Sequence, residues 1–487
     1  MNRILWIVND LNVEEYIHQS IVSTLISFPL VIIEVFVEKI SFTTKFDKTL
    51  QFIKPLDIRF KSYKKSPFEK TNLSKIENTN LVFVLKKDSL SIYDYIIFSN
   101  NKKNDYSFYE NKAKIGLLQF DYDKEKIINY KLSVKRSIPI IFSLKLKASS
   151  DWKFISNMTI NLETGLVNSI EKYFWFQKLS FIKFLNNPNE FEIVKNRKYE
   201  VNFHSIRIIA YYKRLVVTII KRKINKPEKN WKIALKEESK GYLFLNQPEH
   251  SFWADPFLIS RDNKHFVFFE ELNKTTNLGE IACVQLDESF NIELKKTIFK
   301  DDTHFSFPNV FYHNDGFYML PENSEKNSLS LYKATLFPFE WSFHKTIIDN
   351  CKLVDAVWVY HNEYYWLFAN KVEDYEYDNN DALYLYYSKN LDSNQWLSHK
   401  QNPICTDSSR SRGAGAIFKK NGKLFRPAQN CSKFYGANIV LNEIIELSIE
   451  NYEEEYNKAI FPAPEYHGIH TINSQFGIEI FDFLKVE

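Results

Sequence analysis

Glycine and cysteine are scarce in this chain of 487 residues, which contains 11 Gly and 4 Cys. So little glycine beside abundant Phe and Tyr argues against flexible low-complexity tracts and favours strands that pack through aromatic side chains. The cysteines are Cys283, Cys351, Cys405 and Cys431. Because they are widely separated and form no C-x-x-C pair, they provide neither a zinc motif nor a redox motif, and reduced, buried thiols are expected.

Long apolar runs are absent as well. No segment approaches the ~18 uninterrupted apolar residues of a membrane span. The first apolar stretch, at 4–8, is shorter than the ~7–15 residues of a signal-peptide core, so we expect a cytoplasmic protein. The net charge of +4 is too small to imply a nucleic acid or another general polyanion as partner.

The chain nevertheless has the apolar and aromatic content needed for sizeable cores, with 44% hydrophobic and 16% aromatic residues. Its length exceeds the ~250–300 residues at which a single hydrophobic core stops growing, so two or more domains are expected.

Short apolar segments separated by helical or polar ones characterise residues 1–195. Helical spacing covers 13–28, and strand-like segments cover 4–8, 31–39, 81–85, 93–99, 115–122 and 138–147. This alternation predicts an α/β, Rossmann-like open sheet. No G-x-G-x-x-G follows the first strand, which argues against a dinucleotide, and no cofactor is expected.

A basic segment, residues 196–230, connects the two halves of the chain. It surrounds the apolar sequence IRIIAYYKRLVVTII with many Lys and Arg residues. A basic amphipathic helix of this kind can lie on an anionic membrane surface. The alternative, which we favour, is an interdomain helix with one face packed and the other solvated, because both flanking regions offer apolar surface.

Units of strand, polar turn and strand recur from about residue 231 onward. They cover 255–271, 307–323, 354–370, 414–430 and 468–483, with turns near Asn263, Asn314, Asn362, Asn421 and Ser474. Their period of roughly 50 residues is typical of four-stranded propeller blades. We therefore predict an all-β five-bladed β-propeller over residues 231–487, closed by a strand at 231–237 that completes the last blade.

In a propeller, the start of each innermost strand and the end of the second strand lie at the same mouth. The residues gathered there are Asp255, Glu270 and Glu271, then Ser306 and Glu322, then Asp355 and Asn370, then Arg410, Arg412, Arg426 and Gln429, and finally His467 or His470. Trp253 and Trp358 lie close to these positions in the sequence. Loop ends are polar in any β protein, so each residue alone has an ordinary explanation as a solvated turn residue.

Carboxylates that converge in a partly desolvated channel repel one another, and some of their pKa values rise. Glycosyl transfer needs such a split, with one carboxylic acid protonating the leaving oxygen and one carboxylate acting as base or nucleophile. Aromatic walls suit sugar rings, while Asn, Gln and Arg suit hydroxyl, carboxylate or phosphate groups. The predicted ligand is therefore a carbohydrate or sugar phosphate, and the pattern predicts no metal site.

The motifs WADPF, FFEE, MLPENS, DAVW, RGAGAIF, FRPAQNC and HTIN resemble the propeller at the N-terminus of plant glucosamine inositolphosphorylceramide transferases. That propeller also occurs in bacterial proteins joined to a formyltransferase-like domain, and is distantly similar to glycoside hydrolase families 43, 32 and 68. The resemblance implies that Asp255 is the base or nucleophile, that Asp355 tunes the acid or holds the sugar, and that Glu322 is the acid. In those hydrolases the glutamate usually follows both aspartates, whereas here it lies between them.

The resemblance also suggests substrate-binding roles for nine residues: Trp253, Glu271, Trp358, Asn370, Arg410, Arg412, Arg426, Gln429 and His470. The histidine matches one that related hydrolases place near an axial ion or water, although a packed or turn-stabilising histidine fits the position equally well.

Residues 1–195 faintly resemble the formyltransferase-like domain of the bacterial fusions. Formyl transfer needs Asn, His and Asp together, but Leu118 and Phe120 occupy the positions of the Asn-x-His motif. His18 is the only histidine before His204 and lies in the first predicted helix. The resemblance therefore implies a degenerate domain that has lost formyl transfer.

Three functional classes follow. The first is an enzyme of surface-glycan or glycolipid biosynthesis that transfers or hydrolyses a glycosyl unit at the propeller mouth, and this is the class we favour. The second is a non-catalytic protein that binds a glycan or a sugar nucleotide. The third is a formyl or acyl transferase that acts through the N-terminal domain. The sequence leaves the oligomeric state open.

Overall fold

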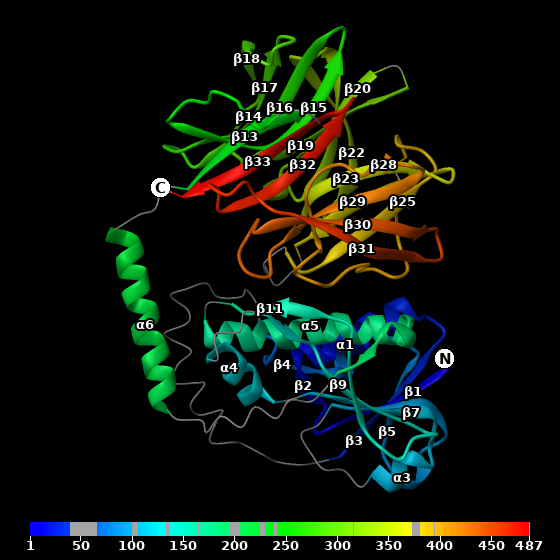
Figure 1. The fold of residues 1–487 in the computed structure, drawn as a ribbon. Helices are drawn as coiled ribbons and strands as arrows, with labels where there is room; N and C mark the ends of the chain where they lie inside the picture. The colour runs from blue at the N-terminus through cyan, green and yellow to red at the C-terminus, as the bar shows by residue number, and fades with distance from the viewer. Residues whose placement is uncertain are drawn as a thin grey trace. The chain divides into compact units, whose positions relative to one another are not determined.

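The computed structural model describes residues 1–38, 66–99, 106–121, 123–132, 137–163, 165–194, 205–224, 229–237, 241–314, 316–372, 380–393 and 395–486. The chain forms two compact units, Met1–Leu215 and Val216–Glu487 (Figure 1). The four cysteines, all within the described residues, form no disulfide, and three of them are buried while Cys351 is partly exposed.

The first unit is built on an open sheet of eight strands in the order β12-β10-β9-β7-β6-β1-β3-β5. Its strands are β1 (Arg3–Val8), β3 (Ile32–Val37), β5 (Leu81–Val84), β6 (Tyr93–Phe98), β7 (Ala113–Phe120), β9 (Phe142–Leu146), β10 (Lys153–Ser156) and β12 (Glu192–Ile193). Strands β5, β3, β1, β6 and β7 are parallel. Strand β7 then pairs with β9 in the antiparallel direction. Ile4–Val8 are fully buried, as a continuous apolar run in a central parallel strand should be.

Among the described residues up to Ile224, five α-helices and two small two-stranded ribbons accompany this sheet. They are α1 (Glu15–Ser27), α3 (Tyr106–Glu110), α4 (Lys124–Leu132), α5 (Leu166–Asn186) and α6 (Ser205–Ile224), with β2 (Asn12–Glu14) pairing β4 (Lys70–Asn72) and β8 (Ser137–Pro139) pairing β11 (Thr159–Asn161). Helices α1 and α5 lie side by side (Figure 1). The predicted helix and five of the six strands are confirmed, but the segment 138–147 divides into β8 and β9, which belong to different sheets.

Helix α6 confirms the helix predicted in the basic segment, and it spans the division between the two units. The flanking parts of that segment, 196–204 and 225–228, lie outside the described residues. Among the described helices, none is both long and apolar enough to cross a bilayer.

The second unit is a propeller of five sheets, which confirms the predicted five-bladed architecture. Blade one contains β15 (Ser251–Arg261), β16 (Lys264–Asn273), β17 (Leu278–Leu286) and β18 (Ile292–Phe299), and blade two contains β19 (Ser306–His313), β20 (Gly316–Glu322), β21 (Ser328–Leu336) and β22 (Glu340–Asp349). Blade three contains β23 (Leu353–His361), β24 (Tyr364–Lys371), β25 (Leu383–Ser388) and β26 (Leu397–Ser398). Blade four contains β27 (Arg412–Gly413), β28 (Phe418–Lys420), β29 (Lys423–Asn430), β30 (Asn438–Leu447) and β31 (Tyr452–Ile460).

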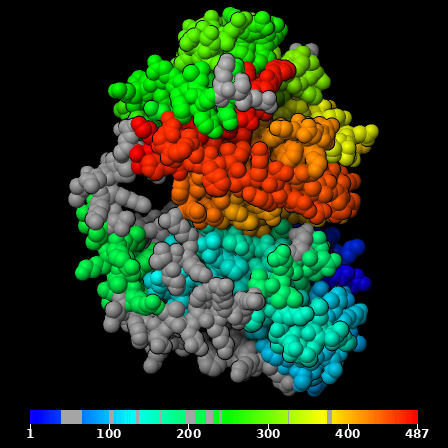
Figure 2. All heavy atoms as spheres, viewed as in Figure 1, coloured from blue at the N-terminus to red at the C-terminus, as the bar shows by residue number. Residues whose placement is uncertain are grey.

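Blade five closes the ring with strands from both ends of the unit. It contains β32 (Gly468–Gln475), β33 (Ile478–Val486), β13 (Lys229–Glu237) and β14 (Leu243–Phe244). Strand β13 pairs with β33 along its whole length, from Lys229 opposite Val486 to Glu237 opposite Ile478. The predicted closing strand is therefore confirmed. In the space-filling view the side chains of blade four and of β32 and β33 in blade five, coloured orange to red, form a continuous surface (Figure 2).

Aromatic side chains pack neighbouring blades together, as the composition predicted. The Phe257 ring of blade one contacts Phe307 of blade two at 5.1 Å between centroids, and Phe368 of blade three contacts Tyr452 of blade four at 5.7 Å. Each fully buried ring stabilises the fold by roughly 1.5–3 kcal/mol through the area removed from water. These contacts hold the five inner strands in a fixed ring.

The turns between the first and second strands use left-handed residues in all five blades. Asn263, Asn314, Asn362 and Asn421 have φ between 49° and 59°, and in the turn of blade five Phe476 has φ 50°. Asparagine tolerates this conformation, which explains the polar turns of the repeat. The turn predicted near Ser474 is displaced by two residues, because Ser474 still belongs to β32.

A β-bulge interrupts the start of the innermost strand in four blades, between Ala254 and Phe257, Ser306 and Asn309, Val354 and Val357, and Ile469 and Ile472. In the first three, the residue inside the bulge has a positive φ: Asp255 (52°), Phe307 (44°) and Asp355 (51°). A bulge also tolerates the proline of WADPF, because its residues do not all donate to the ladder. The motif therefore sets an aspartate at a bend that re-aims its side chain.

Candidate functional site

The two bulged aspartates are held by carboxylates from the preceding blade. The Asp255 amide donates to Asp482 Oδ2 at 2.9 Å, and the Asp355 amide donates to Glu322 Oε2 at 3.0 Å. Asp482 lies on the second strand of blade five and Glu322 on that of blade two. Blades five and one are thus joined in the same way as blades two and three.

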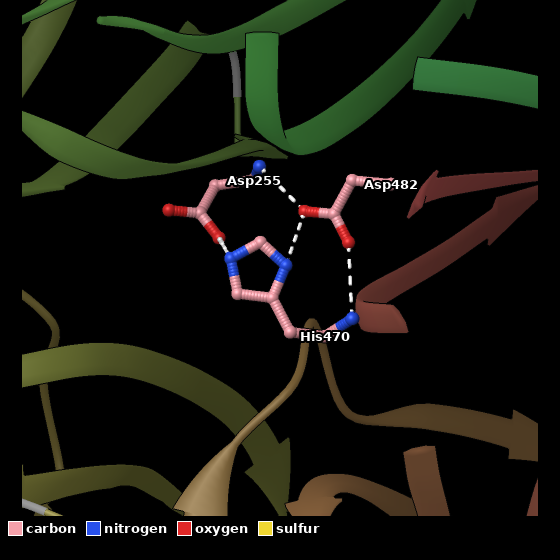
Figure 3. A group of neighbouring side chains, drawn as sticks. All are labelled: Asp255, His470 and Asp482. Carbon is pink, nitrogen blue, oxygen red and sulfur yellow. Dashed lines mark hydrogen bonds and ion pairs between the residues drawn. The ribbon is translucent and has the colours of Figure 1, made fainter. Parts of the chain in front are cut away.

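Asp255, His470 and Asp482 form one buried cluster (Figure 3). His470 Nε2 lies 3.3 Å from Asp255 Oδ1, and His470 Nδ1 lies 2.6 Å from Asp482 Oδ2. The Thr471 hydroxyl donates to Asp255 Oδ1 at 2.9 Å. One imidazole therefore bridges two carboxylates, and a protonated imidazole can donate to both at once.

The electrostatics of the cluster follow from burial and these contacts. Burial raises the pKa of Asp255 to about 7, while the His470 charge acts to lower it and the Glu270, Asp482 and Asp355 charges raise it. Burial would lower the pKa of His470, but the Asp482 and Asp255 carboxylates raise it to about 9. The histidine is therefore a cation at neutral pH that keeps Asp255 ionisable inside the protein.

Asp355 and Glu322 form the second half of the site. Arg412 donates through Nε to Asp355 Oδ2 at 2.6 Å and through a terminal nitrogen to Oδ1 at 3.4 Å, so it holds the carboxylate with both arms. Glu322 is only partly buried. Burial and the Asp355 charge raise the pKa of Glu322 well above its usual range, which favours a neutral carboxylic acid at this position.

Gly413 is required by the close approach of Asp355. A Cβ at position 413 would lie 3.0 Å from both the Asp355 Cβ and its carbonyl oxygen. Asn370 accepts from the Gly413 amide at 3.1 Å, and Gln429 donates to the Gly413 carbonyl at 2.7 Å. The fully buried Asn370 and Gln429 thus hold the backbone at the site rather than facing a ligand.

An aromatic residue that the sequence analysis did not single out lies across the charged groups. Tyr435 is 40% exposed, and its ring contacts His470 at 5.3 Å and lies 5.0 Å from the Arg412 guanidinium. Trp231 stacks on His470 at 3.9 Å and meets Tyr435 edge-on. Tyr435 is therefore an exposed ring placed directly over the charged residues of the mouth.

Glu270 also faces the mouth, since its charge acts on Asp255. It lies 3.1 Å from His304 Nε2, and this hydrogen bond raises the pKa of His304. The adjacent Glu271 points to the opposite face of β16, where it accepts from Trp253 Nε1 at 3.2 Å and contacts Lys295. Trp253 is buried in an apolar cluster of blades five and one, so the structure does not bring Trp253 and Glu271 to the mouth.

Trp358 lies farther along β23, between blades two and three. Its ring packs on Phe311 at 4.5 Å and on Tyr365 at 5.6 Å. Its ring therefore contributes to the packing of the two blades, and its role in substrate binding stays a prediction.

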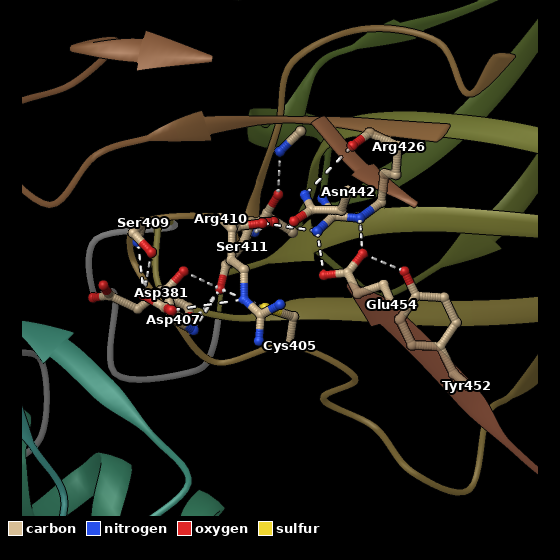
Figure 4. A network of polar contacts seen from close by, with 12 residues as sticks. Asp381, Cys405, Asp407, Ser409, Arg410, Ser411, Arg426, Asn442, Tyr452 and Glu454 are labelled. Atoms are coloured by element: carbon tan, nitrogen blue, oxygen red, sulfur yellow. Dashed lines mark hydrogen bonds and ion pairs between the residues drawn. The ribbon is translucent and has the colours of Figure 1, made fainter. Parts of the chain in front are cut away.

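Arg410 and Arg426 belong to a network inside blade four (Figure 4). Arg426 is 1% exposed and donates to both Glu454 oxygens, at 2.7 and 2.8 Å, and to the Arg410 carbonyl. Burial would raise the pKa of Glu454, but the Arg426 charge lowers it. The Arg410 side chain lies 3.7 Å from Asp407. The sequence predicts a ligand-binding role for Arg426. In the structure its guanidinium instead forms an internal ion pair with Glu454.

The same three residues that form the bridged cluster are candidate metal ligands. Donor atoms of Asp255, His470 and Asp482 lie within 4.8 Å of one another. A metal ion requires a neutral imidazole, whereas the two short imidazole–carboxylate contacts are those of a protonated one. Metal binding and the bridged arrangement are therefore alternative states of the cluster.

Asp482 was missed by the sequence analysis, although the repeat contains the signal for it. The second strands end in FFE, LPE, FAN and IFD. Aligning these ends places Asp482 beside Glu270, Glu322 and Asn370, all of which contact the inner strands. Tyr435 has no such signal, because it lies in the irregular connection between β29 and β30.

Comparison with known proteins relates the propeller unit to a plant enzyme. The chain is 37% identical over 207 residues to glucosamine inositolphosphorylceramide transferase 1 of Oryza sativa subsp. japonica, and 35% identical to the enzyme of that name from Arabidopsis thaliana. The matched region is 42% of this chain but only 28% and 27% of those relatives, so the chain spans about a quarter of their length.

Solved structures give weaker similarities. A family 117 glycoside hydrolase of Zobellia galactanivorans shares 11% identity with a TM-score of 0.36, over 52% of this chain and 90% of that one. The GH32 β-fructofuranosidase of Bombyx mori shares 12% identity with a TM-score of 0.36, over 56% and 61% of the two chains.

The family model described as glucosamine inositolphosphorylceramide transferase 1, N-terminal, matches residues 244–467, a region that runs from β14 of blade five through blade four and stops just before β32.

Proposed function

We propose that the propeller mouth transfers or hydrolyses a glycosyl unit, with Asp255 as base or nucleophile and Glu322 as acid. The observation that carries this proposal is that the Asp255 and Glu322 carboxyl groups have neighbours of opposite charge. Asp255 faces a cationic imidazole, whereas Glu322 faces the Asp355 carboxylate, which raises its pKa. Glycosyl chemistry needs one carboxylate and one carboxylic acid at the same site.

The contacts assign a separate task to each oxygen of Glu322. Its Oε2 accepts from the Asp355 amide, so the proton of the neutral acid resides on Oε1 and can pass to a leaving-group oxygen. Arg412 pairs with Asp355, and the Asp355 charge raises the pKa of Glu322. The exposed Tyr435 ring offers a surface on which a sugar ring can stack.

The similarity of residues 244–467 to the plant transferases supports a carbohydrate ligand. We propose, more finely, a role in surface-glycan or glycolipid biosynthesis at the cytoplasmic side of a membrane. Helix α6 fits that setting. Ile209, Val216 and Ile220 are 66%, 48% and 50% exposed along one stripe, and the helix sequence contains no Asp or Glu. Cosedimentation with phosphatidylserine vesicles, and its loss in Ile220→Glu, tests this membrane contact.

Non-catalytic glycan binding is the second candidate, and one observation favours it. Asp255, Asp355 and His470 are 5%, 3% and 2% exposed, and each is engaged by neighbouring side chains. Charged groups that are satisfied internally can build a rigid floor for a bound glycan without any chemistry.

For the N-terminal unit we propose a Rossmann-like, formyltransferase-like domain that has lost formyl transfer. The burial of Leu118 and Phe120, at 0% and 2% exposure, supports this, because side chains at these positions face the core. The Phe120 ring packs on Phe142 at 5.2 Å. Formation of a formylated product from a nucleotide amino sugar and a formyl-folate donor would contradict the proposal.

The test of the main proposal is turnover of nucleotide-activated sugars. The full chain is incubated with a panel of UDP-hexoses and UDP-N-acetylhexosamines, and release of UDP is measured. Asp255→Asn is expected to lower turnover by about 10²–10⁴-fold, as removal of an acid–base group does. Glu271→Gln, next to Glu270 but on the other face, is expected to retain turnover. Equal turnover by Asp255→Asn refutes the catalytic role, and saturable binding of the sugars by the wild type without turnover favours the second candidate.

A further inference from the structure

A cavity of about 530 Å³ lies between blades four and five, at the turn ends of the strands. His470 marks the mouth on β32, and the cavity is lined on the same strand by residues from Ile472 to Gln475, toward its turn end. Asp255, His470 and Asp482 do not line the cavity. This cavity is therefore distinct from the site at the mouth.

Positive charge dominates the lining of the cavity. Lys419, Lys420, Lys423 and Lys458 contribute to it, against one carboxylate, Glu479. Lys423 pairs with Glu443 at 2.7 Å, outside the lining. The lysines come from the β28–β29 hairpin and from β31, so two separate segments of blade four contribute lysines to the lining. A bound anion would lower the repulsion among them.

Phe476 breaks the turn pattern of the propeller at the rim of this cavity. The equivalent first turn position holds Asp262 in blade one and Asn314, Asn362 and Asn421 in blades two to four, whereas blade five places a phenylalanine there, with φ 50° and 81% of its surface exposed. An aromatic residue gains nothing from this backbone conformation and loses by exposure to water. A residue kept in an unfavourable conformation on the surface points to a contact made with something outside the chain.

The rest of the lining suits a sugar. Asn421, Asn457 and Gln475 offer amide groups, and the stacked Phe418 and Phe425 rings, 5.6 Å apart, form an apolar wall. The volume lies within the ~300–1,000 Å³ of small-molecule sites. Amides pair with hydroxyl groups, aromatic rings pack on the apolar face of a sugar, and lysines bind phosphate or carboxylate groups.

We propose that this cavity is a second carbohydrate site, which binds a glycan bearing phosphate or carboxylate groups, with Phe476 stacking on a sugar ring and Lys420 and Lys458 holding the anionic group. The site does not depend on chemistry at the mouth. It would hold one part of an anionic glycan chain away from the residues around Asp255.

The experiment uses the full chain on an array of immobilised oligosaccharides that carry phosphate groups, uronic acids or neither. The wild type is expected to bind a subset of the anionic glycans, and Phe476→Asn, which introduces the asparagine of blades two to four, is expected to bind them at least tenfold more weakly with an unchanged or higher unfolding temperature. Lys420→Ala/Lys458→Ala is expected to lose the same signals. Lys264→Ala, at the corresponding hairpin of blade one, serves as the control and is expected to retain them.

Several outcomes would overturn the proposal: no anionic glycan bound by the wild type, equal binding by Phe476→Asn, neutral glycans bound as strongly, or complete displacement by inorganic phosphate at the concentration of the glycan. Asp255→Asn separates this site from the mouth. It is expected to bind the anionic glycans as the wild type does, whether or not the mouth is catalytic.

Discussion

Replacement of His470 by glutamine tests whether a buried cation holds blades five and one together at the mouth. The imidazole lies 3.3 Å from Asp255 and 2.6 Å from Asp482, and all three side chains are buried. At an effective dielectric constant of about 20, each ion pair at such distances is worth roughly 5 kcal/mol before desolvation is subtracted. Removing one partner of a buried charge cluster costs about 3–5 kcal/mol net.

The pKa of His470 gives a second, independent value for the free energy that the protonated imidazole contributes to folding. The pKa of His470 rises from 6.5 in the unfolded chain to about 9 in the folded protein. The stability that the protonated imidazole contributes is therefore fully present below pH 6.5 and is lost as the pH rises through 9. The difference corresponds to about 3 kcal/mol, which agrees with the structural figure. The wild type is therefore expected to lose about that much stability between pH 6.5 and 9.5.

The assay is urea unfolding at pH 6, with hydrogen exchange of β32 and β33 peptides to locate the change in the propeller. His470→Gln is expected to lower the free energy of unfolding by about 3–5 kcal/mol. His344→Gln is the matched control, because His344 lies 2.7 Å from Asp392 but both side chains are substantially exposed. His344→Gln is expected to lower the free energy of unfolding by less than about 1 kcal/mol. Equal costs for the two variants would refute the argument from burial.

Three further predictions follow from the contacts. Gly413→Ala is expected to cost about 1–3 kcal/mol in thermal unfolding, because its Cβ would meet the bulged aspartate of blade three at 3.0 Å, whereas Gly241→Ala has nothing within 4 Å and is expected to be near neutral. Glu454→Gln leaves a buried guanidinium uncompensated and is expected to cost about 3–5 kcal/mol in urea unfolding without changing ligand binding at the mouth. Thr471→Val removes the donor to Asp255 and is expected to raise the pKa of that carboxyl by about one unit, read from an NMR pH titration of the variant.

The blades could be predicted from the sequence because each repeat carries its own local signals. The asparagine turns recur at a nearly constant spacing, and the pairing of β13 with β33 follows from the need to complete the last blade. Asp255 and Asp355 could be predicted for the same reason, since both occupy the same place in their repeats. Glu322 could be placed by the end of its second strand.

The side chains around the bulges could not be oriented from strand alternation. Residues two apart in a regular strand share a face, so strand alternation alone would direct Trp253 and Asp255 to the same side. The left-handed conformation of Asp255 breaks the alternation, and Trp253 is directed into the core instead. Pattern alone also cannot decide whether an arginine such as Arg426 meets a ligand or an internal partner on the next strand but one, here Glu454.

The repeat also explains how Glu322 can be the candidate acid although it lies between Asp255 and Asp355 in the sequence. Asp482 and Glu322 perform the same structural task, since each accepts from the amide of a bulged aspartate in the next blade. Their surroundings differ in two respects: Asp482 is fully buried and faces a cation, whereas Glu322 is partly exposed and faces a carboxylate. Only the second combination gives a carboxyl group that is both neutral and accessible to a ligand. A single framework position, repeated around the ring, therefore yields a structural anchor in blade five and a candidate proton donor in blade two.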